Sequence, residues 1–177
     1  ETLRSFHGIR EDLTLFETAA SMVGSVRALS GGDEADRRVF NLLYNALDAL
    51  ETCDSGFENI EAALGVKLSI LAGYAPQLDV CLACGTDLDA ASDPLHFAPE
   101  HGGVLCQECR TATGDAFPLA PGTLESLRTL VETPIRQAPV QTGPKQSVLR
   151  VVRSHVLAHA PGNTLVGPRL AESGRRA

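Results

Sequence analysis

The sequence has few aromatic residues and no long apolar run. Aromatic residues make up 5% of the 177 positions and tryptophan is absent, so there is no aromatic-rich strand platform for single-stranded bases. The longest apolar stretches, such as 68–75, are far shorter than the roughly 18 to 20 residues that a membrane span needs, which excludes a transmembrane protein. No basic and then apolar segment opens the chain, so we expect no secretory signal peptide. The chain also begins without methionine, from which we expect a processed or cropped chain.

The sequence also lacks a glycine-rich phosphate loop and any alternation of strands with helices, which argues against a doubly wound nucleotide-binding fold. Its apolar residues instead recur three and four positions apart, the period of an amphipathic helix. In the first such segment they form one apolar face that includes Leu13, Phe16 and Val23. This period predicts helices over 11–29, 34–51, 57–73, a short segment entered through Pro121 and running to Val131, and 145–159, with a proline-rich loop from Thr133 to Pro144.

Four of the five cysteines form two Cys-x-x-Cys pairs, Cys81 with Cys84 and Cys106 with Cys109, separated by 21 residues. Each pair allows a tight turn that aims both sulfurs at one point, and two such turns supply the four thiolates of a tetrahedral zinc site. We therefore predict one structural Zn²⁺ per chain, with no open position for a catalytic water. The alternatives are redox Cys-x-x-Cys motifs or buried free thiols, but redox motifs usually lie in a strand–helix–strand context that is missing here.

The other cysteine and four of the histidines are not expected to bind this metal. Cys53 lies in a turn that ends a predicted helix. His96 and His101 lie between the two cysteine pairs and are expected on the surface, because four cysteines already complete the site. His155 and His159 are four residues apart on the last predicted helix, where they could form a metal pair. No third ligand lies nearby, so surface or core histidines are the favoured interpretation.

Charge is divided unevenly along the chain. The net charge of −7 arises from −12 over residues 1–109 and +5 over residues 110–177. A basic face needs only charge and reach to contact phosphates, so the C-terminal part is the predicted nucleic-acid contact, although a plain solvated helix face is the alternative. The candidate phosphate-contacting residues are Arg128, Arg136, Lys145, Arg150, Arg153 and Arg169.

Together these patterns predict a mainly α-helical protein, a helical domain interrupted by a small four-cysteine finger of the zinc-ribbon kind. Residues 1–77 are expected to form the first part of the helical domain, 78–112 the finger, and 113–177 the C-terminal helical part packed on the first. No general base, open metal position or nucleophile can be assembled from the sequence, so we predict that the protein is not an enzyme.

Four segments in the same order resemble the bacterial recombination mediator family RecO. The junction Gly73-Tyr74-Ala75-Pro76-Gln77-Leu78-Asp79-Val80-Cys81-Leu82-Ala83-Cys84-Gly85 is similar to the family's passage from helix to finger. The segments 6–13, 102–109 and 117–124 are similar to its entry into the helical domain, its second cysteine turn and the approach to its next helix. The resemblance covers nearly the whole chain.

The resemblance implies a cytoplasmic accessory protein of RecF-pathway DNA repair. Such proteins bind single- and double-stranded DNA, anneal complementary strands, and act with RecR and the C-terminal tail of single-stranded-DNA-binding protein to load RecA. The family also carries an N-terminal OB domain, which would lie upstream of Phe6 and is absent from this chain. Its tail-binding groove lies in the helical domain, and the exposed edge of the 34–71 helices is our candidate, with Arg37, Arg38 and Lys67 as the available bases. The alternative function is a zinc-ribbon protein-interaction scaffold without direct DNA binding.

Overall fold

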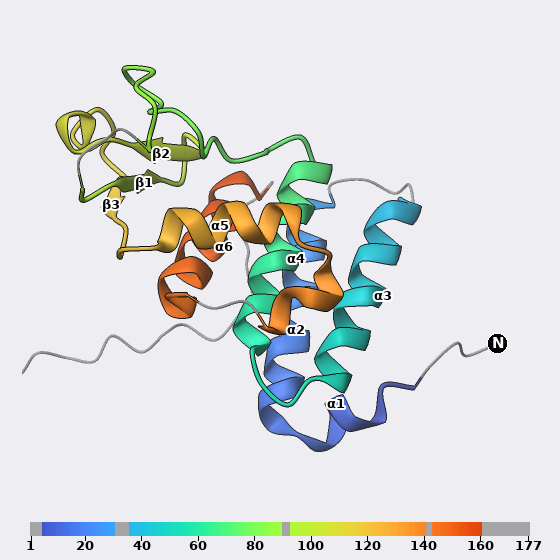
Figure 1. Ribbon diagram of the computed structural model, residues 1–177. Coiled ribbons are helices and arrows are strands. Elements are labelled where there is room, and N and C mark those ends of the chain that lie inside the picture. The colour runs from blue at the N-terminus through green and yellow to red at the C-terminus, as the bar shows by residue number, and fades with distance from the viewer. Residues whose placement is uncertain (1–4, 31–35, 90–92, 141–142, 161–177) are drawn as a thin grey trace, which may run out of the picture.

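The protein consists of a helical body and a smaller lobe that contains a short β-sheet (Figure 1). The computed structural model describes residues 5–30, 36–89, 93–140 and 143–160. The expectation of a mainly helical protein interrupted by a four-cysteine lobe is confirmed. The helices of the body are α1 His7–Glu11, α2 Leu13–Leu29, α3 Arg37–Thr52 and α4 Phe57–Leu71 before the lobe, and α5 Thr123–Glu132 and α6 Lys145–His159 after it.

The helix predicted over 11–29 begins two residues later, as α2 at Leu13, and a short helix that was not predicted, α1, precedes it and ends at Glu11. Asp12 has an extended backbone, and its carboxylate accepts hydrogen bonds from the amides of Thr14 and Leu15 at 2.8 and 3.0 Å. An aspartate in this position satisfies amides that the first helical turn leaves without partners. The chain therefore turns at Asp12, and α1 folds back against α2 and α3.

The other predicted helices differ from the structure mainly at their ends. α3 begins at Arg37 after its cap Asp36, whose side chain accepts a hydrogen bond from the Arg38 amide; the predicted start at 34 lies outside the described residues. α4 ends at Leu71, two residues earlier than predicted, and α6 has the predicted bounds. The predicted loop contains the 3₁₀ helix η2 Ile135–Val140.

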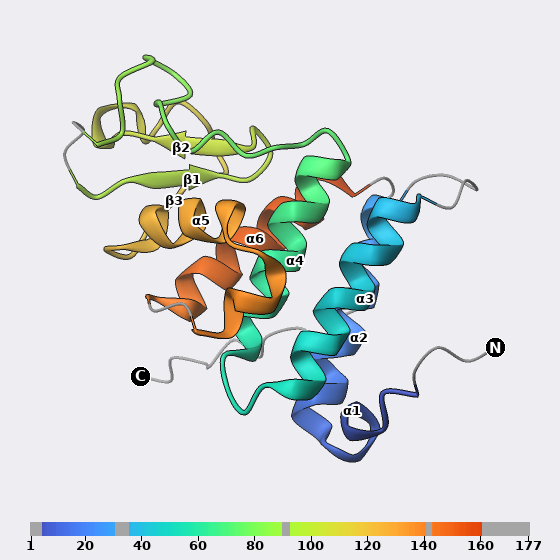
Figure 2. The same ribbon diagram turned by 45° about the vertical axis from the view of Figure 1, so that its right-hand side comes forward.

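α4 is the central element of the body. It contacts α2, α3, α5 and α6. Both views show it between the pair α2 and α3 and the pair α5 and α6 (Figure 2). Residues from Asn59 to Val66 are buried without interruption, as expected for a helix surrounded on all sides. Gly65 allows α6 to approach closely, because a Cβ atom there would lie 2.3 Å from Cγ1 of Val152.

The lobe extends from Leu78 to Pro118, and we call it the finger lobe. Its antiparallel sheet has the order β2-β1-β3, formed by β2 Gly103–Leu105, β1 His96–Ala98 and β3 Phe117–Pro118. In the register, Phe97 pairs with Val104 on one side and with Phe117 on the other. β3 lies beyond the predicted finger boundary at 112, and the three domain boundaries stay a prediction.

The sheet rests on the helical body through Phe97. This side chain is fully buried, and its ring centre lies 5.9 Å from that of His155 on α6. Phe97 and Leu78 also meet Val66 and Leu127 around one small cavity of about 10 Å³. The finger lobe is therefore packed against α4, α5 and α6. Among the helices that the structure describes, none has the length and apolar character to cross a membrane.

Candidate functional site

The four predicted metal ligands meet at the edge of the finger lobe. The sulfurs of Cys81, Cys84, Cys106 and Cys109 all lie within 4.8 Å of one another. Two turns bring them together: the Gly85 amide donates to the carbonyl of Cys81 at 2.9 Å, and the Cys109 amide donates to that of Cys106 at 3.1 Å. Gly85 has a φ of +73°, which glycine adopts without the strain that a side chain would cause.

The sulfur geometry fits a tetrahedral zinc ion. With Zn–S bonds of about 2.3 Å, two sulfurs of a regular tetrahedron lie about 3.8 Å apart. The sulfurs of Cys84 and Cys106 are 3.8 Å apart, far from the roughly 2.0 Å of a disulfide. The residues of this site therefore suit the ion predicted from their spacing. Four sulfur ligands complete its coordination, so such a metal would hold the two turns together.

Backbone amides around the cluster stabilise a negatively charged cysteine sulfur, which is the form that binds a metal cation. Burial raises the pKa of Cys81, but hydrogen bonds from the amides of Cys106, Cys84 and Ala83 outweigh this and lower it to about 6. The neighbouring Cys106 and Cys84 raise the pKa of Cys109 to about 12, because they disfavour a further thiolate beside them. One cysteine thus loses its proton readily, whereas a bound cation is needed to stabilise all four cysteines as thiolates.

The histidines considered as possible ligands, and Cys53, lie outside the cluster of four cysteines. His101 is exposed, as predicted, and its Nδ1 lies 3.5 Å from Oδ1 of Asp115. His96 is buried on β1, contrary to the predicted surface position. His155 is a core histidine whose Nε2 lies 2.8 Å from the carbonyl oxygen of Tyr74, and burial lowers its pKa.

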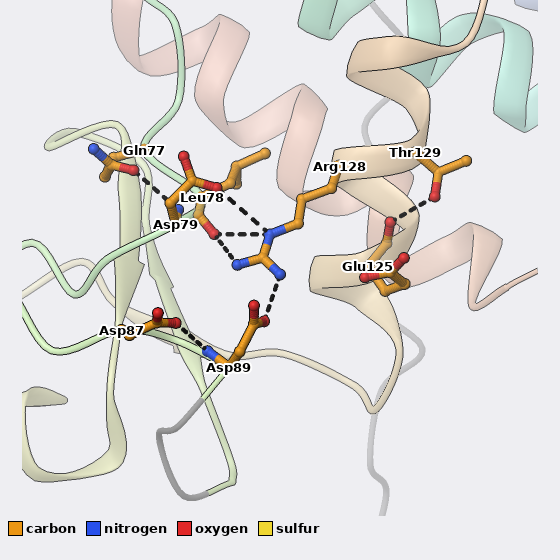
Figure 3. A network of polar contacts seen from close by, with 8 residues as sticks. All are labelled: Gln77, Leu78, Asp79, Asp87, Asp89, Glu125, Arg128 and Thr129. Atoms are coloured by element: carbon orange, nitrogen blue, oxygen red, sulfur yellow. Dashed lines mark hydrogen bonds and ion pairs between the residues drawn. The ribbon is translucent and has the colours of Figure 1, made fainter.

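Arg128 fastens the finger lobe to the helical body (Figure 3). From α5 it donates two hydrogen bonds to the carbonyl of Leu78, from Nε at 3.1 Å and from Nη2 at 2.9 Å. Its Nη1 lies 2.5 Å from Oδ1 of Asp89, which raises the pKa of the guanidinium. This arginine was predicted to contact phosphate, but the structure places it between two parts of the protein.

Two further predicted phosphate contacts also have internal partners. Arg153 forms two hydrogen bonds with the buried carboxylate of Glu61 at 2.7 and 2.9 Å, which links α6 to α4. Arg136 contacts the buried Asp48 and donates to Oδ1 of Asn45 at 3.0 Å, which links η2 to α3. The sequence contains no signal for these pairings, since the partners are about 90 residues away.

The remaining residues predicted to contact phosphate are not described as part of an internal ion pair. Arg150 is exposed on α6 and lies 4.2 Å above the ring of Phe117. Lys145 lies at the start of α6; its amide donates to the carbonyl of Gly143 at 2.9 Å, and its ammonium group has no hydrogen bond or ion pair to any residue that the structure describes. Arg169 lies outside the described residues. A DNA contact by any of these residues stays a prediction.

A groove that the sequence did not indicate runs along α2. Its volume is about 710 Å³, and its walls include Phe6, Phe16, Val23, Leu47 and Ala160. Phe16 and Val23 are 54% and 39% exposed, although the sequence placed them on a helix face expected to pack. The apolar periodicity was correct, but no described part of this chain covers that face.

Two arginines lie at this groove. Arg10, in the last turn of α1, and Arg27, in the last turn of α2, both contribute to its wall. Within the described residues neither guanidinium has an acidic partner. The edge of the 34–71 helices, where the tail-binding groove was predicted, has fewer free basic side chains. Lys67 donates to the carbonyl of Val131 at 2.7 Å, and Arg38 pairs with Asp36 at 2.8 Å.

The fold and these sites define a class: a helical protein with an inserted four-cysteine finger and an apolar groove. The comparison with known sequences is more specific. Residues 10–165 match the family described as Recombination protein O C terminal. The chain therefore belongs to the RecO family.

Its relatives carry the name DNA repair protein RecO. The protein of Rubrobacter xylanophilus is 50% identical over 177 residues, which cover 99% of this chain and 70% of that protein. Those of Symbiobacterium thermophilum and Desulforamulus reducens are 31% and 29% identical over 78% and 88% of this chain. The matched regions span 54% and 60% of these two proteins, which is less than two thirds of their length. The family supports a role in DNA repair and recombination.

Proposed function

We propose that this chain is the zinc-stabilised, non-catalytic partner-binding part of a RecF-pathway recombination mediator that acts in the cytoplasm. In this role it binds single- and double-stranded DNA, RecR and the C-terminal tail of single-stranded-DNA-binding protein, and it promotes strand annealing and RecA loading. The observation that carries the proposal, beside membership of the family, is the apolar groove flanked by Arg10 and Arg27.

The groove has the chemistry that an acidic peptide with an apolar end requires. Apolar walls receive a terminal phenylalanine side chain, and the two guanidinium groups pair with carboxylates of the peptide. Phe16 and Arg27 are eleven residues apart on α2, about 16 Å along the helix. An extended peptide of about five residues covers that length.

Zinc has a structural role in this proposal. The four cysteines would hold the ion, and the ion supplies the free energy that keeps the two turns folded. DNA contacts are assigned to the exposed part of the basic C-terminal region, for which Lys145 and Arg150 are the first candidates. Arg128 and Arg153 are weaker candidates, since their guanidinium groups already bind Asp89 and Glu61.

The groove is tested with a fluorescent acidic peptide that carries the C-terminal residues of single-stranded-DNA-binding protein. We expect Arg10→Glu with Arg27→Glu to weaken binding by at least tenfold, the equivalent of about 1.4 kcal/mol, because two attractive charges become repulsive. Arg110→Glu is the matched control, since this exposed arginine of the finger lobe bonds only to the carbonyl of Gln107 among the described residues. Equal binding by the double variant and the control would contradict the assignment of the groove.

A second candidate is a protein-interaction scaffold without direct DNA binding, and one observation favours it. Residues 78–118 contain seven acidic residues and one basic residue, a net charge of −6 that repels phosphates. Binding of a labelled single-stranded oligonucleotide across a salt series separates the two functions. Affinity that falls steeply with salt, and falls further in Lys145→Glu with Arg150→Glu, supports the DNA-binding mediator. Absence of binding at low salt supports the scaffold.

A further inference from the structure

Three aromatic rings form a continuous ridge beside the groove. Phe6, Tyr44 and Phe40 are three of only eight aromatic residues in the chain. The ring centres of Phe6 and Tyr44 are 5.8 Å apart in an edge-to-face arrangement, and those of Tyr44 and Phe40 are 6.4 Å apart and nearly parallel. Phe6 also forms part of the groove wall, so the ridge begins where the groove ends.

The ridge is anchored at one end and open at the other. Phe6 has a φ of +46°, the one positive value for a residue other than glycine in the described ranges. Next to it, the Gly8 amide donates to Oε1 of Glu51 at 3.0 Å, which ties α1 to α3 and keeps Phe6 against Tyr44. Phe40 is 57% exposed although it is large and apolar. Exposed aromatic side chains of this kind are typical of protein-binding surfaces.

Arg37 adds a positive charge at the open end of the ridge. It is the first residue of α3, three positions before Phe40, and it is exposed. A cation there opposes the helix dipole, so it does not stabilise α3. Arg38 pairs with Asp36, whereas Arg37 has no acidic partner within the part of the chain that the structure describes.

We propose that the ridge of Phe6, Tyr44 and Phe40 extends the groove and binds the upstream residues of the same acidic peptide. This inference rests on the tail-binding part of the proposed function. An extended peptide advances about 3.3 Å per residue, so the two ring-to-ring steps accommodate roughly four residues beyond those in the groove. Carboxylates among these residues then reach Arg37, and the apolar parts of their side chains cover Phe40.

The test compares two acidic peptides that end in phenylalanine, one of six residues and one of twelve. We expect the native chain to bind the longer peptide more tightly. Phe40→Ala should weaken the longer peptide about fivefold and change the shorter one by less than twofold, and Arg37→Glu should do the same. Leu157→Ala is the control, because Leu157 is 39% exposed on α6, outside both surfaces. Circular dichroism confirms folding of each variant.

The outcomes separate this inference from the function on which it rests. If the native chain binds both peptides equally and Phe40→Ala changes neither, the ridge is not part of the site, while the groove assignment stands. If neither peptide binds, tail binding itself fails. A labelled single-stranded oligonucleotide is measured in parallel. If Phe40→Ala weakens only the oligonucleotide, the ridge stacks on bases and the peptide proposal is overturned.

Discussion

The helical body and the finger lobe keep their shapes by different means. α4 is buried from Asn59 to Val66, and the helices around it cover it with apolar side chains. The finger lobe has an apolar inner side around Phe97, but its outer turns offer four cysteines and mostly exposed neighbours. Packing therefore maintains the body, whereas the proposed zinc ion and a few polar contacts would maintain the outer lobe. The two regions should respond separately to substitution.

The largest effect is expected at the metal cluster. Cys106→Ser removes one of four sulfur ligands, so we expect loss of zinc, unfolding of both cysteine turns and lower solubility. Zinc binding is worth about 10–16 kcal/mol in small zinc-finger peptides, far more than the lobe can replace. Metal analysis together with amide hydrogen exchange measures both changes. Cys53→Ser is the control and should keep the zinc. A zinc-free variant with an unchanged fold would show that the ion does not maintain the lobe.

The next largest effect is expected in the core of the body. Leu68 on α4 is 1% exposed, and Leu68→Ala leaves a cavity that should lower the free energy of unfolding by about 2–5 kcal/mol. Chemical denaturation measures this loss, and the zinc content should stay at one ion per chain. Ile70→Ala, on the same helix at 38% exposure, should cost less than about 1.5 kcal/mol. Loss of zinc in Leu68→Ala would show that the two regions do not respond separately.

The smallest effect is expected where the two regions join. Arg128→Ala removes the hydrogen bonds to Leu78 and the ion pair with Asp89, at an expected cost of about 1–3 kcal/mol. Amides of the finger lobe should exchange faster, while zinc remains bound. Arg128→Lys should not restore protection, because an ammonium group cannot reproduce the planar fork that binds a carbonyl and a carboxylate together. Full protection in the lysine variant would mean that charge alone joins the lobe to the body.

The sequence was most informative where a pattern is local. The cysteine spacing predicted which four residues come together, because two short turns fix the directions of the sulfurs. The bounds of α6 followed from apolar periodicity. The short helix α1 before Asp12 was not predicted, and the capping hydrogen bonds of Asp12 show where the chain turns into α2.

The candidate binding surfaces depend on distant contacts, which the sequence does not contain. Arg153 resembled a free basic side chain until its partner Glu61, 92 residues earlier, was located. The apolar face with Phe16 and Val23 was predicted, but periodicity cannot tell whether another element covers such a face. The groove is formed by residues that are distant in the sequence, so only the three-dimensional structure shows it and its two arginines.

The finger lobe, α5 and η2 lie between α4 and α6 in the chain, and this separation affects the order in which the protein assembles during translation. The last residue of α6 leaves the ribosome 88 residues after the last residue of α4. At about 5–20 residues per second, this delay is roughly 4–18 s, during which one side of α4 has not yet met its partner. Cys109 emerges well before α6, so under our proposal the nascent chain would bind zinc while the hydrophobic core is still incomplete. If the four cysteines bind zinc as proposed, a shortage of zinc would act on this protein while it is being synthesised, before it is fully folded.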